Sequence, residues 1–121
     1  MKEWMAVGLA GMAGAVSRTA ISHVIPHTGG IPYPTLLVNL SGAFLLCALI
    51  AAAPFRSPWK AAVQTGFLGS FTTFSALSAE LSGMMADEQW GTAFIYGLLS
   101  VGGGLLSGLA GQRFGKGRVK P

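Results

Sequence analysis

Four long apolar segments, separated by short connectors, dominate this chain of 121 residues and limit what it can fold into. A helix needs about 20 mostly apolar residues to cross the hydrocarbon core of a bilayer. Segments of this kind occur at residues 4–24, 33–53, 59–85 and 90–112. Only 10% of the residues are charged, and a soluble chain this short could not bury so much apolar surface in one core. We therefore predict an all-α membrane protein with a single transmembrane domain of four helices over residues 1–121.

The basic residues are concentrated on one side of the predicted membrane. The net charge is +4, but the basic side chains flank apolar segments and do not form the face that nucleic acid requires. Four spans place both termini and the central connector on one side. That side holds seven of the eight Lys and Arg residues: Lys2, Arg56, Lys60, Arg113, Lys116, Arg118 and Lys120. Because positive charge favours the cytoplasmic side, we predict cytoplasmic termini and no nucleic-acid partner.

The third span contains a segment, residues 66–75, that is poorly suited to a regular helix. It reads GFLGSFTTFS and contains two Gly, two Thr and two Ser residues. Non-helical backbone at membrane depth is stable only where protein buries it or where it lines water. Its freed carbonyls can coordinate a hard cation. A kinked helix with back-bonded hydroxyls is the alternative, but the density of these residues favours a functional break that serves an ion.

Two polar residues in the first two spans need partners. Arg18 lies inside the first span, where a charge costs about 2.5–3.5 kcal/mol on insertion scales. It either extends to the nearby interface, lines an electropositive vestibule or anchors a neighbouring backbone. Asn39 lies in the second span, and an amide in hydrocarbon requires hydrogen bonds. It forms an interhelical hydrogen bond or donates to an anion.

Hydroxyl groups and one carboxylate occupy the last two spans. Tyr96 and Ser100 are four residues apart and share a helix face. Together with Thr73 and Ser75 they form a candidate hydroxyl track for an anion, and ordinary packing is the alternative. Glu80 is the only acidic residue well inside a span. It lines an aqueous vestibule or, alternatively, takes part in proton coupling.

Three segments of the chain resemble the Fluc (CrcB) fluoride-channel family. They read GLAGMAGAVSR at residues 8–18, TLLVNLSGAFL at 35–45 and GFLGSFTTFS at 66–75, and the last is the most specific. The resemblance extends over nearly the whole chain. It implies an antiparallel dimer of four-helix subunits in the plasma (inner) membrane of a prokaryote, with two fluoride pores. It also implies a structural Na⁺ at the dimer crossing, and export of fluoride down its electrochemical gradient to relieve cytoplasmic toxicity.

The resemblance also implies roles for particular residues. Gly69 and Thr72 would offer backbone carbonyls to sodium, and Arg18 would line the vestibule. The residues of the fluoride pore would be Asn39, Phe74, Thr73, Ser75, Tyr96 and Ser100. A ring edge is the positive part of the aromatic quadrupole. It can therefore contact fluoride weakly, and conduction requires weak, successive sites.

The chain departs from the family pattern at two positions. The second Phe expected three residues after Phe74 is Leu77, and Gly104 replaces the last residue of the polar track. A leucine has no ring edge to offer. The strong charge bias also favours one orientation, whereas antiparallel homodimers need both. We therefore predict a heterodimer with a second family member that supplies the missing ring, with a homodimer as the alternative.

Two other functions compete with a channel. A small four-helix multidrug/proton antiporter needs a carboxylate within its first helix, and this chain has only Glu3 at the end of that helix. A non-conducting scaffold subunit of a heterodimeric channel is consistent with Leu77. No nucleophile–base pair or phosphate loop is present, so the sequence does not indicate an enzyme.

Overall fold

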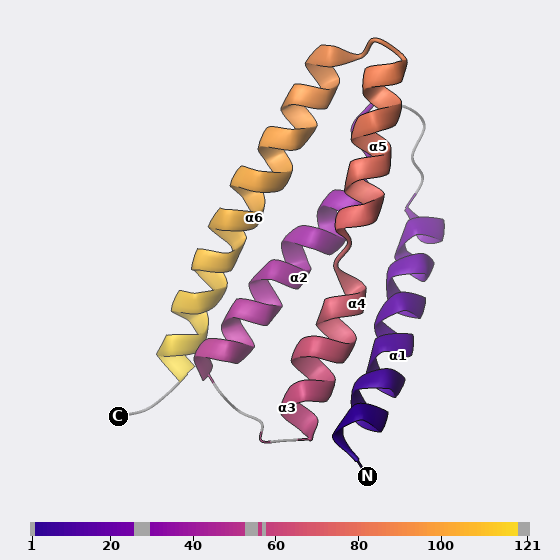
Figure 1. The fold of residues 1–121 in the computed structure, drawn as a ribbon. Coiled ribbons are helices and arrows are strands. Elements are labelled where there is room, and N and C mark those ends of the chain that lie inside the picture. The colour runs from indigo at the N-terminus through magenta and orange to yellow at the C-terminus, as the bar shows by residue number, and fades with distance from the viewer. Residues whose placement is uncertain (1, 26–29, 53–55, 57, 119–121) are drawn as a thin grey trace.

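The chain is helical throughout apart from its connections, in a computed structural model that describes residues 2–25, 30–52, 56 and 58–118. Four long helical segments run alternately up and down (Figure 1). The elements are α1 (Glu3–Val24), α2 (Tyr33–Ala52), α3 (Trp59–Ala61), the π-helix η1 (Ala62–Leu68), α4 (Gly69–Phe71), α5 (Phe74–Ala86) and α6 (Trp90–Arg118).

Each of the four predicted spans corresponds to helical structure, with differences at the ends. The third span is assembled from α3, η1, α4 and α5. The helix α6 continues to Arg118, beyond residue 112 where the fourth span is predicted to end. Its last residues are polar, and a helix that leaves the bilayer keeps its backbone hydrogen bonds. Residue 53, where the second span was predicted to end, lies outside the described residues.

Two of the described helices are long and apolar enough to cross a membrane by length and composition alone. They are α2 and residues Trp90–Gly117 of α6. The remaining helical segments are α1, which contains Arg18, and the divided third span. For these two segments the membrane assignment depends on the family membership reported below.

Glycines allow close packing within two pairs of helical segments. In the first pair, α6 lies against α2, and a Cβ on Gly111 or Gly115 would overlap the α2 backbone at Phe44 or Ala48. In the second pair, α1 lies against η1 and α4, and a Cβ on Gly14 would overlap the backbone of Phe67. Small residues at such contacts let helices associate without a hydrophobic driving force.

The segment α5 continues from α4 and packs on α6 (Figure 1). Met84 of α5 and Tyr96 of α6 are buried together there, and Leu36 and Leu77 pack against them. The break lets the third span change its packing partner, because α4 contacts α1 before the break and α5 contacts α6 after it.

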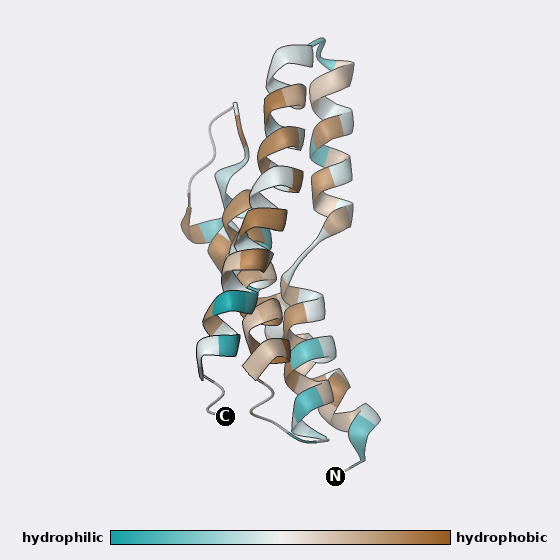
Figure 2. Ribbon diagram, turned by 90° about the vertical axis from the view of Figure 1, so that its left-hand side faces the viewer, coloured by the Kyte–Doolittle hydropathy of each residue, from teal (hydrophilic) through white to brown (hydrophobic). Residues whose placement is uncertain are grey.

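Many large apolar side chains face outward. Phe74 is 80% exposed and Val101 72% exposed. Hydrophobic residues fill the middle of the helices, and hydrophilic residues gather near the end that carries both termini (Figure 2). Apolar surface of this extent requires lipid or a partner chain to cover it.

The start of α1, the end of α2, the start of α3 and the end of α6 lie at the same end of the bundle (Figure 1). Lys60 near the start of α3 and Lys116 near the end of α6 belong to this end. Asp87 and Glu88 connect α5 to α6 at the other end. The fold therefore arranges the charges as the sequence predicts.

Candidate ion-binding site at the broken helix

The third span is non-helical only at Thr72 and Thr73. Both residues are extended, with φ and ψ of −79° and 153° for Thr72 and −146° and 119° for Thr73. This break is much shorter than the predicted segment 66–75. The residues before the break remain helical, first as the seven-residue π-helix η1 and then as the short α-helix α4. The Gly and Ser residues of the segment therefore do not end the helix: Gly66 lies in the π-helix, and Gly69, Ser70 and Ser75 lie in α-helical turns.

Asn39 of α2 forms two hydrogen bonds with the backbone of the break. Its Nδ2 donates to the carbonyl of Thr73 at 2.9 Å, and its Oδ1 accepts from the amide of Thr73 at 2.7 Å. The interhelical alternative for Asn39 is thus present in the structure. An amide group has two N–H donors, so one remains for another ligand.

The break leaves four carbonyls, those of residues 69–72, without their usual helical donors, and Gly69 and Thr72 are among them. In a continuous α-helix the Gly69 carbonyl would accept from the amide of Thr73, but that amide donates to Asn39. The Thr72 carbonyl would accept from the amide of Ala76, but that amide donates to Thr73 Oγ1 at 3.1 Å. Both carbonyls belong to the two residues predicted to bind sodium, and oxygen ligands of this kind suit hard cations.

Arg18 reaches the same region from α1. Its Nε donates to the carbonyl of Ser70 in α4 at 3.2 Å. The backbone-anchor alternative for Arg18 is therefore the one that the structure displays. The guanidinium also places a positive charge beside the last turn of α4.

The start of α5 presents the predicted pore residues Phe74 and Ser75. Thr73 caps this helix, and its hydroxyl lies 3.3 Å from that of Ser75. The Phe74 ring is 80% exposed in the single chain. A hollow of about 230 Å³ lies beside it, lined by Asn39, Thr72, Thr73, Phe74 and Leu77.

A second polar cluster lies farther along α5 and was not anticipated. Thr35 Oγ1 donates to Glu80 Oε1 at 2.6 Å, and Tyr96 Oη donates to Glu80 Oε2 at 3.3 Å. A carboxylate inside a membrane needs such donors. The position of Glu80 inside a span was the signal available in the sequence.

The four predicted hydroxyls do not form one continuous track in the single chain. Thr73 and Ser75 contact each other, whereas Tyr96 contacts Glu80. The Ser100 hydroxyl is buried and has no hydrogen-bond partner among the described residues. A buried hydroxyl without a partner is costly, so Ser100 has a donor available for a ligand.

These observations define a class: small helical membrane proteins with a helix broken in mid-span and hydrogen-bonding groups gathered at the break. The family described as CrcB-like protein, Camphor Resistance (CrcB), matches residues 5–112 of this chain. The chain belongs to the CrcB family.

Named relatives are similar over nearly their whole lengths. The "Fluoride-specific ion channel FluC 2" of Geobacillus kaustophilus is 44% identical over 114 residues, covering 89% of this chain and 88% of the relative. The "Fluoride-specific ion channel FluC" of Deinococcus radiodurans is 42% identical over 120 residues, covering 93% and 94%.

Proposed function

We propose that this chain is a subunit of a fluoride-specific ion channel that exports fluoride down its electrochemical gradient. The similarity to named fluoride channels along almost the entire chain carries the proposal. The family membership also argues against an enzyme. The Arg18–Ser70 bond adds to the case against a drug/proton antiporter, because the charged residue inside α1 is a cation that binds the backbone, and no carboxylate lies there.

Fluoride efflux from liposomes tests this proposal. Vesicles that contain the purified assembly should release fluoride as soon as a potassium ionophore relieves the charge imbalance, without any pH gradient. Phe74→Ile should lower the rate at least tenfold. Phe94→Ile is the matched control, since Phe94 is also an exposed ring, at 69%, but lies on α6 away from the break. Efflux that requires a proton gradient would favour an exchanger.

A structural sodium ion fits the freed carbonyls of Gly69 and Thr72. One chain offers two such oxygens, and a hard cation takes about six. A second chain that crosses at the same break would double the set, and Gly69 is exposed for such a contact. These features support an antiparallel dimer around the ion. Bound sodium would supply positive charge at the centre of the assembly.

The pore would run past the groups that still have a donor to offer. These are the second N–H of Asn39, the ring edge of Phe74 and the hydroxyls of Ser75 and Ser100. Thr73 and Tyr96 would act mainly by fixing the start of α5 and the position of Glu80, since the Thr73 hydroxyl accepts from the Ala76 amide and contacts Ser75, and the Tyr96 hydroxyl donates to Glu80. Arg18 would contribute charge to the vestibule while it holds α4.

The partner in this dimer would be a different family member. Leu77 takes the place of a ring, and it is committed to packing against the Met84–Tyr96 cluster. A partner's Phe would complete the pore beside the hollow at Phe74. Co-expression tests this: the pair should conduct, and this chain alone should conduct at least tenfold less. Equal fluoride efflux rates from this chain alone and from the pair would establish a homodimer. If Phe74→Ile in this chain leaves the efflux rate of the pair unchanged, this chain is a non-conducting scaffold.

The localisation we propose is the plasma (inner) membrane of a prokaryote, with both termini in the cytoplasm. The charges at the two ends of the bundle support this orientation. When fused to the C-terminus, a reporter that works only in the cytoplasm should be active, and a reporter that works only outside the cytoplasm should be inactive. Activity of both reporters would show that the chain inserts in both orientations and would favour the homodimer.

A further inference from the structure

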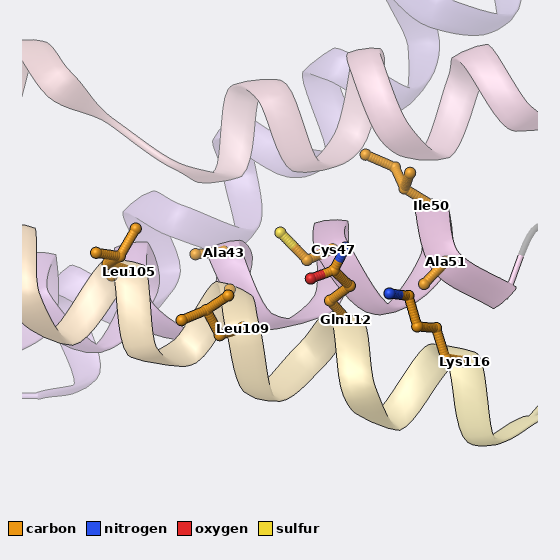
Figure 3. A pocket seen from close by; sticks show the side chains of 10 residues that line it. Ala43, Cys47, Ile50, Ala51, Leu105, Leu109, Gln112 and Lys116 are labelled. Atoms are coloured by element: carbon orange, nitrogen blue, oxygen red, sulfur yellow. The ribbon is translucent and has the colours of Figure 1, made fainter.

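A second hollow, of about 410 Å³, lies between α2 and α6 toward the end that carries the termini (Figure 3). Its walls combine small residues, such as Gly104 and Gly108 on α6, with large apolar ones, Ile50 on α2 and Leu105 and Leu109 on α6. The space has room for on the order of ten waters. Nothing in the function proposed so far uses this hollow.

Polar groups are placed at one end of the hollow. Gln112 and Lys116 extend from the last turns of α6 toward α2 (Figure 3). Among the described residues that line the space, Lys116 is the only charged one. An ammonium group and an amide N–H are both suited to an anion.

The hollow lies next to the proposed ion path. Gly104 follows Ser100 by one helical turn, and the Ser100 hydroxyl is buried without a partner. Gly104 and Gly108 carry no side chains that would obstruct the hollow along α6, and Cys47 Sγ lies 3.3 Å from where a Cβ of Gly108 would stand. A wide entrance would let fluoride keep its water until it reaches the narrow region near the break.

We propose that the hollow between α2 and α6 is the water-filled entrance to the anion path, and that Lys116, assisted by Gln112, concentrates anions in it. This inference rests on the proposed channel function. A cleft with one sign of charge and apolar walls focuses the electric field and raises the local concentration of its counter-ion. One charge within about 4 Å in water corresponds to roughly a fivefold enrichment.

Cys47 makes the water content of the hollow measurable. It is the only cysteine of the chain, it is part-buried, and its side chain projects into the hollow (Figure 3). Two membrane-impermeant methanethiosulfonate reagents are compared, an anionic one (sulfonatoethyl) and a cationic one (trimethylammonioethyl). Each is applied separately to the assembly in liposomes, and it is present both inside and outside the vesicles. The intact mass of this chain reports modification. Cys47→Ser gives the background, and Asp87→Cys in the Cys47→Ser chain shows that the reagents are active.

We expect both reagents to modify Cys47, with the anionic reagent favoured. Lys116→Gln should lower the anionic-to-cationic rate ratio roughly fivefold. Arg113→Gln is the matched control, because it removes the same charge from the same helix but Arg113 does not line the hollow. Both side chains are exposed, but Arg113→Gln should change the ratio much less, because the field of a charge weakens with its distance from the hollow. Lys116→Gln should also reduce fluoride efflux several-fold at low fluoride and little at saturation.

Three results would overturn the inference. If neither reagent modifies Cys47 while Asp87→Cys reacts, lipid or a partner chain fills the hollow. If Lys116→Gln and Arg113→Gln have equal effects on the ratio, Lys116 has no local role. If Lys116→Gln changes the ratio but not the efflux at low fluoride, the hollow is not on the conducting path. Absence of fluoride flux from the unmodified assembly would instead contradict the channel function, and the Cys47 labelling would remain a separate result.

Discussion

The side-chain amide of Asn39 pairs with both backbone groups of Thr73, across the gap between α2 and the broken third span. This pairing takes the amide that would otherwise close the helix onto the Gly69 carbonyl. One polar residue in α2 thus fixes where the third span is interrupted. It also leaves the Gly69 carbonyl oxygen without its helical donor, so that this oxygen can bind an ion.

Asn39→Asp should destabilise the protein and reduce fluoride efflux. An aspartate can still accept from the Thr73 amide, but its second oxygen faces the Thr73 carbonyl and cannot donate. A part-buried carbonyl left without its donor costs about 1–3 kcal/mol. Thermal unfolding in detergent measures this, with Gln89→Glu as an exposed amide-to-acid control. Equal melting temperatures for the two variants would contradict the pairing.

Gly42→Ala should displace the break. A Cβ on Gly42 would overlap Cγ2 of Thr72, and overpacking typically costs about 1–3 kcal/mol. The control is Gly97→Ala, because nothing lies within 4 Å of a Cβ there. Thr72→Ser removes the obstructing methyl, so it should recover much of the stability in the double variant. If the Gly42→Ala variant unfolds at the same temperature whether residue 72 is Ser or Thr, overlap with the Thr72 methyl is not the cause of the destabilisation.

Glu80→Leu should be much more destabilising than Glu80→Gln. The leucine leaves the hydroxyls of Thr35 and Tyr96 without their acceptor, at about 1–3 kcal/mol for each buried group. Glutamine keeps an acceptor oxygen and should lose less than half as much. Denaturation midpoints compare the two variants. Equal losses would show that the charge of Glu80 matters and that its hydrogen bonds do not.

Replacing sodium by N-methylglucamine at constant ionic strength should weaken the assembly. An ion bound only to the folded dimer at a hundredfold excess over its dissociation constant contributes about 2.7 kcal/mol. The melting temperature and the dimer fraction should therefore rise with sodium concentration and reach a plateau. Potassium serves as the control for general salt effects. A melting temperature that depends on ionic strength alone would contradict a specific sodium site.

Much of the fold follows directly from the sequence. Long apolar segments can satisfy their backbone only as helices in a bilayer, so four helical segments and their approximate bounds are determined locally. The placement of Lys60 and Lys116 at one end follows from the number of spans. The composition of residues 66–75 also locates the interruption, although it overstates the length.

The particular contacts at the site depend on the tertiary structure. Gly, Ser and Thr residues weaken a helix over ten positions, but a two-residue break appears only where Asn39 competes for the Thr73 amide. Likewise, Arg18 had three possible roles until the packing of α1 on α4 brought it to Ser70. Glu80 obtained its partners from two other helices.

The sequence by itself therefore determined the membrane-embedded helices, their likeness to the CrcB family and the helix that breaks. Local composition is sufficient for these, because hydrophobicity and helix propensity act within one segment. Only the tertiary structure decided that the break lies at Thr72 and Thr73 and that the third span packs on α1 before the break and on α6 after it. Hydrogen bonds and glycine contacts between distant segments make that choice, and they exist only once the helices pack.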